Sequence, residues 1–267
     1  FVTGASFPDI PATDIPLDRL MPYFDRNLLA AVCGVKGGAP FPFAREAEAV
    51  LASPGLTVRV CARFYPCRRA GDDIVSADGT LRLPMLRQET APYRSLADFF
   101  PAQPADACDC HPAPASPLGL FAAKVEGGSG DNELILHAVR VTLAEAASAW
   151  LRARFSAQAP AGAKVVMPGI GYACCPDHSL KRDVLERLPI GIRLTESCAM
   201  IPEASVCGLV IAHPDAFFPD IHLLTEKARG EYLSRRPLSS EEAELFLGAL
   251  TRAAAESAAA ESAATAE

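Results

Sequence analysis

Two short clusters combine cysteine with histidine, residue types that serve as nucleophiles, bases and metal ligands. Cys175 and His178 stand three positions apart, and Cys108, Cys110 and His111 fall within four positions. A thiol beside an imidazole could form a nucleophile–base pair, or both could bind a metal. A structural zinc site normally takes four ligands from two separated pairs. No clear second pair accompanies the second cluster, so we predict no metal site there.

Other polar groups are expected to bind a ligand, to fix a turn or to face water, rather than to act as nucleophiles or metal ligands. Asp25 and Glu145 are acids that could accept hydrogen bonds from a ligand or simply face water. Residues 213–215, His-Pro-Asp, follow an apolar run and are expected to fix a turn, with lining a site as the alternative. Arg68 and Arg69 precede Gly-Asp-Asp, so we interpret them as a solvated turn rather than an anion site.

The elements that must position these groups alternate without a strict strand–helix–strand rhythm. Periodicity predicts strands at 56–62, 74–75, 81–83, 118–125, 192–194 and 205–212. It predicts helices at 44–51 and 132–155, and a Ser239/Glu242 capping box opens a helix through Leu250. Strands joined by short turns favour an α+β fold with a largely antiparallel sheet. We divide the chain into an irregular Pro-rich lead (1–16), one domain (17–250) and a helix-prone Ala/Glu/Ser tail (251–267).

Composition narrows the class of protein. With 267 residues and 50% hydrophobic residues, the chain can bury a substantial core. Its net charge of −7 argues against nucleic acid or an anionic membrane surface as a partner. No apolar run approaches the roughly 20 residues of a membrane helix. Nine cysteines, an odd number that includes adjacent Cys174 and Cys175, indicate reduced thiols and a cytoplasmic protein.

Several motifs, taken in order, carry a family resemblance. They are residues 23–25 (Tyr-Phe-Asp), 64–66 with 71–74, 86–90, 96–99, 143–146, 171–178, 194–208 and 213–215. In order and spacing they resemble the reactivation (activation) domain of cobalamin-dependent methionine synthase, over about residues 17–250. The resemblance implies a single C-shaped α+β domain, with a twisted, largely antiparallel sheet flanked by helices. It also implies binding of S-adenosylmethionine (AdoMet), which remethylates a cobalamin oxidised out of the catalytic cycle.

The resemblance also implies a ligand site. By position in the motifs, the site comprises Asp25, Glu145, Met167, Gly169, Gly171, Tyr172 and Phe218. The two acids suit the ammonium group and ribose hydroxyls of AdoMet, and glycine in the 171–172 turn lets the backbone approach a ligand closely. We expect replacement of either acid to change stability little. No residue is expected to act covalently, so the 175–178 segment is interpreted as a structural or docking loop.

Three positions depart from the family pattern. Met167 stands where the pattern has an arginine that binds the ligand carboxylate, and Phe218 where it has a tyrosine. Val141 occupies a helix position where the pattern has an acid that meets the displaced cobalt-ligand histidine. A thioether cannot donate a hydrogen bond. Loss of the arginine's charge-assisted hydrogen bond to the ligand carboxylate costs about 1.5–3 kcal/mol, so we expect weaker binding of AdoMet.

Two functions remain open from the sequence. The first is an AdoMet-binding methyltransferase module that reactivates methionine synthase or a related corrinoid methyltransferase and is incomplete alone. Its partners would be a cobalamin-carrying module and a flavodoxin-type or other reductant. No cobalamin, homocysteine or folate module is recognisable, so we expect an excised fragment or a subunit acting in trans. The alternative is a non-catalytic docking or capping module for a cobalamin protein, with weak or no AdoMet binding.

Overall fold

Two antiparallel strands that are buried except at their ends, β5 (Ser116–Glu126) and β9 (Ser205–His213), form the middle of the fold. Successive side chains of a strand point to opposite faces of the sheet. Phe121 therefore joins the apolar cluster on one face, while Leu120 joins the cluster on the other. Both faces of these strands are covered, which accounts for their nearly continuous apolar sequence.

The computed structural model describes residues 1–2, 6–36, 39–103 and 114–265. Within them the main sheet has seven strands, in the order β4-β3-β2-β5-β9-β6, with β1 also paired to β2. The remaining strands are β1 (Ile10–Asp14), β2 (Thr57–Ala70), β3 (Asp73–Ser76), β4 (Arg82–Pro84) and β6 (Lys164–Val166), with β7 (Arg193–Leu194) and β8 (Met200–Ile201) in a separate hairpin. Every pairing between these strands is antiparallel, which confirms the predicted sheet type.

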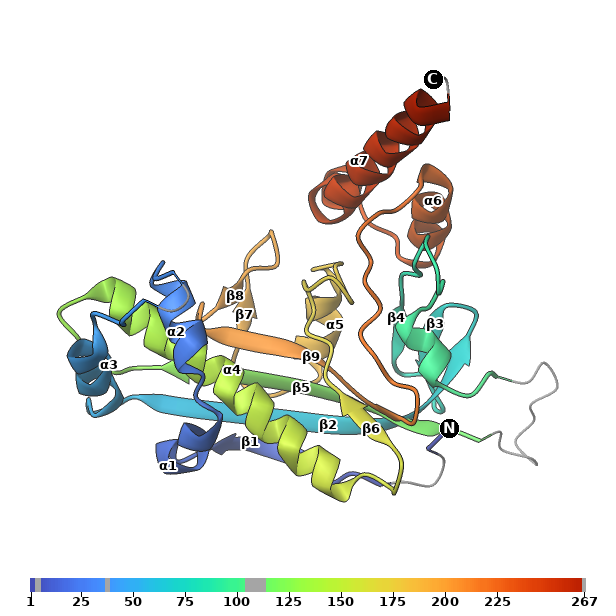
Figure 1. Ribbon diagram of the computed structural model, residues 1–267. Helices are drawn as coiled ribbons and strands as arrows, with labels where there is room; N and C mark the ends of the chain where they lie inside the picture. Colours follow the sequence, from blue (N-terminus) through green and yellow to red (C-terminus); the bar gives the residue numbers. More distant parts are fainter. Residues whose placement is uncertain (3–5, 37–38, 104–113, 266–267) are drawn as a thin grey trace.

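Helices cover both faces of the sheet and extend beyond one end of it (Figure 1). They are α1 (Leu17–Leu20), the 3-10 turn η1 (Met21–Tyr23), α2 (Arg26–Val32), α3 (Ala44–Leu51), the 3-10 turn η2 (Leu96–Phe99), α4 (Glu133–Gln158), α5 (Leu180–Glu186), α6 (Glu226–Arg235) and α7 (Ser240–Thr265). The α6–α7 pair rises from the end that carries β3 and β4, away from α2 and α3 (Figure 1). This arrangement is the α+β fold expected from the sequence.

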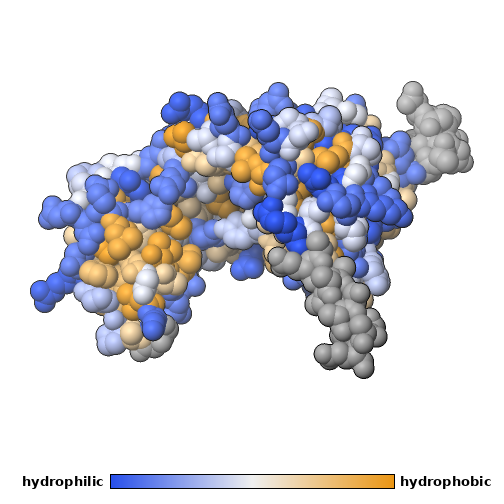
Figure 2. All heavy atoms as spheres, turned by 90° about the horizontal axis from the view of Figure 1, so that it is seen from above, coloured by the Kyte–Doolittle hydropathy of each residue, from blue (hydrophilic) through white to orange (hydrophobic). Residues whose placement is uncertain are grey.

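The long helix α4 packs its apolar stripe on one face of the sheet. Ile135, Val139 and Leu143 are fully buried in the same cluster as Phe121. By length and composition alone, α4 is the one helix in the described part of the chain that could cross a membrane, and 56% of its most apolar window is buried. That burial is against the sheet, as in the core helix of a globular domain. The surface in Figure 2 is largely hydrophilic, with separate apolar patches.

Two predictions about local structure were wrong. The 1–16 lead is not wholly irregular, because β1 pairs with β2 through Ile10, Thr13 and Asp14. Arg68 and Arg69 do not form a turn, because β2 continues through them and pairs with β3 before the chain reverses at 71–72. In the first case pairing with a distant strand decided the backbone conformation. In the second the hairpin with β3 keeps the chain extended up to the reversal.

The C-terminal helix α7 begins with the predicted capping box. The Glu242 amide donates to Ser239 Oγ (3.1 Å) and the Ser239 amide donates to Glu242 Oε2 (3.0 Å). The helix does not end near Leu250 but continues to Thr265. The alanine-rich sequence accounts for this length, because alanine has the highest helix propensity.

The cysteines of the described residues are free thiols. Seven cysteines form no disulfide; they are Cys33, Cys61, Cys67, Cys174, Cys175, Cys198 and Cys207. Burial raises the pKa of the Cys67 and Cys207 thiols to about 12. These thiols therefore behave as small apolar groups, as expected for unreactive core cysteines.

Candidate ligand site

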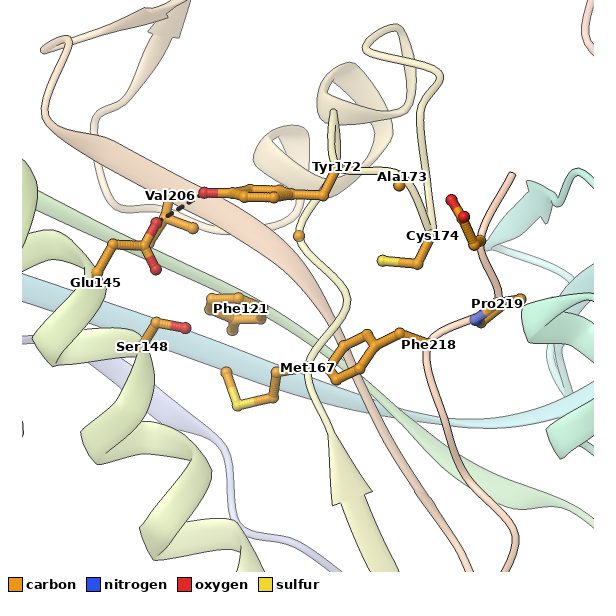
Figure 3. A pocket seen from close by; sticks show the side chains of 12 residues that line it. Phe121, Glu145, Ser148, Met167, Tyr172, Ala173, Cys174, Val206, Phe218 and Pro219 are labelled. Atoms are coloured by element: carbon orange, nitrogen blue, oxygen red, sulfur yellow. Dashed lines mark hydrogen bonds between the residues drawn. The ribbon is translucent and has the colours of Figure 1, made fainter. Parts of the chain in front are cut away.

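A cavity of about 440 Å³ lies between α4, one face of the sheet and two loops (Figure 3). Its walls are mainly apolar, with a few polar groups. The lining residues are Phe121, Glu145, Ser148, Met167, Gly169, Tyr172, Ala173, Cys174, Val206, Phe218, Pro219 and Asp220. A mostly apolar pocket with a few convergent polar groups is typical of a small-molecule site.

Five segments of the chain meet at this cavity. Glu145 and Ser148 come from one face of α4, because residues three apart on a helix are neighbours. Phe121 and Val206 come from β5 and β9 and point to the same face of the sheet. The rest of the lining comes from residues 167–174, after β6, and 218–220, after β9.

Glycine allows the 167–170 segment to cross β9 at close range. The Leu209 amide donates to the Pro168 carbonyl (2.9 Å), and the Ile170 amide donates to the Cys207 carbonyl (3.0 Å). A Cβ on Gly208 would lie only 2.1 Å from the Pro168 carbonyl oxygen. A side chain at Gly208 is therefore incompatible with this crossing, which positions Met167 and Gly169 in the cavity wall.

The turn that follows is held by backbone and buried polar contacts. Gly171 has a φ of 98°, and a Cβ there would lie 2.7 Å from the His178 ring. The Gly171 amide donates to the Cys175 carbonyl (2.8 Å). Asp177, 1% exposed, accepts hydrogen bonds from the Ser179 amide (2.8 Å) and from Tyr232 Oη of α6 (2.7 Å). The turn is therefore anchored to α6 just after the residues 172–174 that line the cavity.

Tyr172 reaches across the cavity to α4. Its hydroxyl donates a hydrogen bond to Glu145 Oε1 (2.7 Å), as Figure 3 shows. Burial, together with this bond and the negative charge of Glu145, raises the pKa of Tyr172 well above its usual value. The phenol is therefore neutral at physiological pH. The Tyr172–Glu145 contact connects the loop to the helix on opposite sides of the cavity.

The structure brings together most of the site residues that the sequence indicated. Glu145, Met167, Gly169, Tyr172 and Phe218 all line the cavity. Met167 is 8% exposed and forms part of the wall, whereas Phe218 is 49% exposed at the opening.

Two indicated residues do not line the cavity. Gly171 packs against His178, one residue before Tyr172. Asp25 instead caps α2, where its Oδ1 accepts a hydrogen bond from the Asn27 amide (2.8 Å). Because Asp25 is a helix cap, its replacement should lower stability, contrary to the expectation from the sequence. A ligand role for Asp25 or Gly171 stays a prediction.

Loss of the Asp25 cap gives a direct stability prediction. Asp25→Ala leaves the Asn27 amide without its acceptor, so the free energy of unfolding should fall by about 1 kcal/mol. Asp25→Asn keeps the cap, since asparagine caps helices about as well as aspartate, and should restore most of the loss. Urea unfolding followed by circular dichroism measures both variants. Equal stability of Asp25→Ala and the parent would contradict a capping role.

Sequence reasoning missed part of the cavity wall. Phe121 and Val206 were predicted only as strand residues, and Ser148, Cys174 and Asp220 carried no motif signal of their own. The spacing of Ser148 from Glu145 is a usable signal, because it places both on one helix face. Asp220 could be found only once the 218–220 segment was seen to lie beside 172–174, where the Ile221 amide donates to the Ala173 carbonyl (2.9 Å).

The other candidate groups have structural roles. Cys175 is 4% exposed, and the His178 ring contacts Lys181 Nζ (2.9 Å) rather than the cavity. His213 ends β9 in a turn, where its Nδ1 accepts from the Asp215 amide (3.1 Å), as predicted. Residues 108–111 lie outside the described residues. Within those residues, no group of three or more His, Cys, Asp or Glu could hold a metal ion.

Comparisons with known proteins agree on one family and one fold. A family model described as "Vitamin B12 dependent methionine synthase, activation domain" matches residues 44–237. The crystal structure of the MetH reactivation domain bound to AdoHcy is similar to this chain, with a TM-score of 0.75 and 22% sequence identity. The match covers 94% of this chain and 92% of that one. At this level of identity, the structural likeness establishes a common fold.

Proposed function

Because this chain belongs to the family of activation domains of vitamin B12-dependent methionine synthase, we propose that its cavity binds AdoMet for reactivation of a corrinoid methyltransferase. The enzyme served would be cobalamin-dependent methionine synthase or a relative. The observation that carries the proposal is the position of the cavity. The motif residues 167–174 and Glu145 of α4 meet at one apolar pocket, and the similar domain of MetH was crystallised with AdoHcy.

The chemistry of the cavity fits most of AdoMet. Its apolar walls, including Phe121 and Val206, suit the adenine ring. The Glu145 carboxylate can accept charge-assisted hydrogen bonds from an ammonium group or from ribose hydroxyls. Tyr172 Oη donates to Glu145, and its oxygen can at the same time accept a hydrogen bond from a ligand. These groups bind and orient, and none is needed as a nucleophile.

The methionine carboxylate of AdoMet fits less well. No Lys or Arg is among the described residues that line the cavity, and Met167 supplies a thioether. This observation favours the second candidate function, a docking or capping module for a cobalamin protein that has lost tight AdoMet binding. A titration distinguishes the two functions. A micromolar dissociation constant for AdoMet supports the reactivation module, and no binding up to millimolar concentration supports the docking module.

The proposed role is mainly one of positioning. The cavity would hold the methyl donor and exclude water while a partner module presents its cobalamin, so that proximity provides most of the rate enhancement. The partner is a cobalamin-binding module, and we propose a flavodoxin-type or other protein as the reductant. We propose neither nucleic acid nor membrane as a partner. The free thiols favour a cytoplasmic location.

Removal of the Glu145 charge tests the proposed site. Glu145→Gln should weaken AdoMet binding by about tenfold, because one charge-assisted hydrogen bond is replaced by a weaker neutral one. Stability should change little, since glutamine can still accept from Tyr172 Oη. Isothermal titration calorimetry measures the affinity. Glu133→Gln, an exposed position in the first turn of α4, is the matched control and should bind like the parent. If both variants bind equally well, Glu145 does not contact the ligand.

A further inference from the structure

The ionisable groups of the cavity lining give it a negative charge at neutral pH. Glu145 and Asp220 are its two carboxylates, and the described lining residues include no Lys or Arg. Burial raises the pKa of Cys174 to about 11, and the charge of Asp220 adds to that rise. Tyr172 is likewise held neutral by burial and by Glu145. The thiol and the phenol therefore leave the negative charge of the two acids uncompensated within the lining.

The two carboxylates favour a positively charged ligand, and the aromatic rings of the lining add to that preference. Phe121, Tyr172 and Phe218 contribute rings to the lining, from a strand and from two different loops (Figure 3). The face of an aromatic ring attracts a cation, and the attraction strengthens where water is excluded. Phe121 is 0% exposed, so its ring lies where water is excluded.

The two acids reach the cavity from opposite sides. Glu145 is half-buried on α4, whereas Asp220 is 66% exposed on the loop after β9, with His222 Nδ1 at 3.6 Å from its Oδ2. Figure 3 shows Glu145 on the helix side, with Cys174 across the cavity from it. Asp220 belongs to the Cys174 side, because the neighbouring Ile221 amide donates to the Ala173 carbonyl (2.9 Å). A bound cation would therefore be attracted from both sides.

We propose that this cavity distinguishes the methyl donor from its demethylated product by positive charge, with Asp220 as a residue that sets this specificity. The inference rests on the proposed function. AdoMet and AdoHcy differ only in the methyl group on sulfur and the positive charge that it confers. When an acceptor nucleophile forms a bond to the methyl carbon with its own electron pair, the methyl–sulfur bond breaks, and sulfur keeps that bonding pair and becomes a neutral thioether. The product then loses its attraction to the two acids and the rings, which favours its release.

Calorimetric titration of the chain with three ligands tests the proposal. AdoMet carries a sulfonium, AdoHcy a neutral thioether, and sinefungin a protonated amine at the corresponding position. At low salt, AdoMet and sinefungin should each bind about tenfold more tightly than AdoHcy. Raising the ionic strength should reduce the ratio, because salt screens the exposed Asp220 charge.

A pair of variants assigns the effect to Asp220. Asp220→Asn removes one charge and should lower the AdoMet/AdoHcy affinity ratio to about threefold, mainly by weakening AdoMet. Asp215→Asn removes an equal charge from an exposed position on the same loop outside the lining, and should leave the ratio unchanged. Equal effects of the two variants would mean that general surface charge, not Asp220, sets the ratio.

The outcomes separate this inference from the proposed function. If AdoMet binds and AdoHcy binds as tightly or more tightly, selection by charge is wrong while the AdoMet site stands. If sinefungin binds like AdoHcy, the methyl group is recognised by shape and the charge argument also fails. If none of the three ligands binds at millimolar concentration, the proposed AdoMet site itself is wrong.

Discussion

Gly208→Ala should remove ligand binding and lower the free energy of unfolding by about 3 kcal/mol or more, at the upper end for overpacking. The added methyl group would lie 2.1 Å from the Pro168 carbonyl oxygen and 2.8 Å from the Phe121 ring. Backbone cannot yield as a flexible side chain can. The 167–170 segment would have to move away from β9 and lose the two hydrogen bonds that bind it there.

Thermal and urea unfolding measure the free energy of unfolding of Gly208→Ala. Titration of its folded fraction with AdoMet measures the affinity of the site. Gly230→Ala is the matched control, because Gly230 lies within α6 and a Cβ there meets nothing within 4 Å. Alanine should be neutral or stabilising at that position by up to about 1 kcal/mol. If Gly208→Ala unfolds like the parent and still binds ligand, the close crossing does not position the cavity.

The fold was predictable where local pattern and burial agree. Residues 44–51 form α3 with the predicted bounds, and β5 and β9 appear where apolar runs predicted them. Strands β1 and β6 were missed, and the end of β2 was taken for a turn. Strands β1 and β6 owe their conformation to pairing with β2 and β9, which lie far away in the sequence, whereas the end of β2 is held extended by its hairpin with β3.

The candidate site was predictable to the extent that motifs carried it. The motif positions supplied Glu145, Met167, Gly169, Tyr172 and Phe218, which converge on one cavity. Asp220 was missed because its side chain acquires a role only where two loops lie side by side. The helix cap at Asp25 was missed because an acid before a helix has the same sequence signal as an acid in a ligand site.

The position of Met167 leads to the second large effect. Met167→Arg should tighten AdoMet binding by about 5- to 30-fold, equivalent to 1–2 kcal/mol, less than a fully buried ion pair would provide. Met167 is 8% exposed in the cavity wall, so an arginine stem can follow the same path and present its guanidinium to a ligand. The guanidinium offers paired donors that match a carboxylate. Desolvation of the new charge offsets part of the gain.

The effect should be selective for ligands that carry the methionine carboxylate. AdoMet and AdoHcy should both gain, whereas decarboxylated AdoMet, which keeps the sulfonium and adenosine, should gain nothing. Met167→Leu, which preserves an apolar wall of similar volume, should bind each ligand like the parent. Calorimetry of the three ligands with both variants provides the comparison. If Met167→Arg weakens AdoMet, or strengthens the decarboxylated ligand equally, Met167 does not face the carboxylate. The docking-module function would then be favoured, because the remaining lining offers that carboxylate no cationic partner.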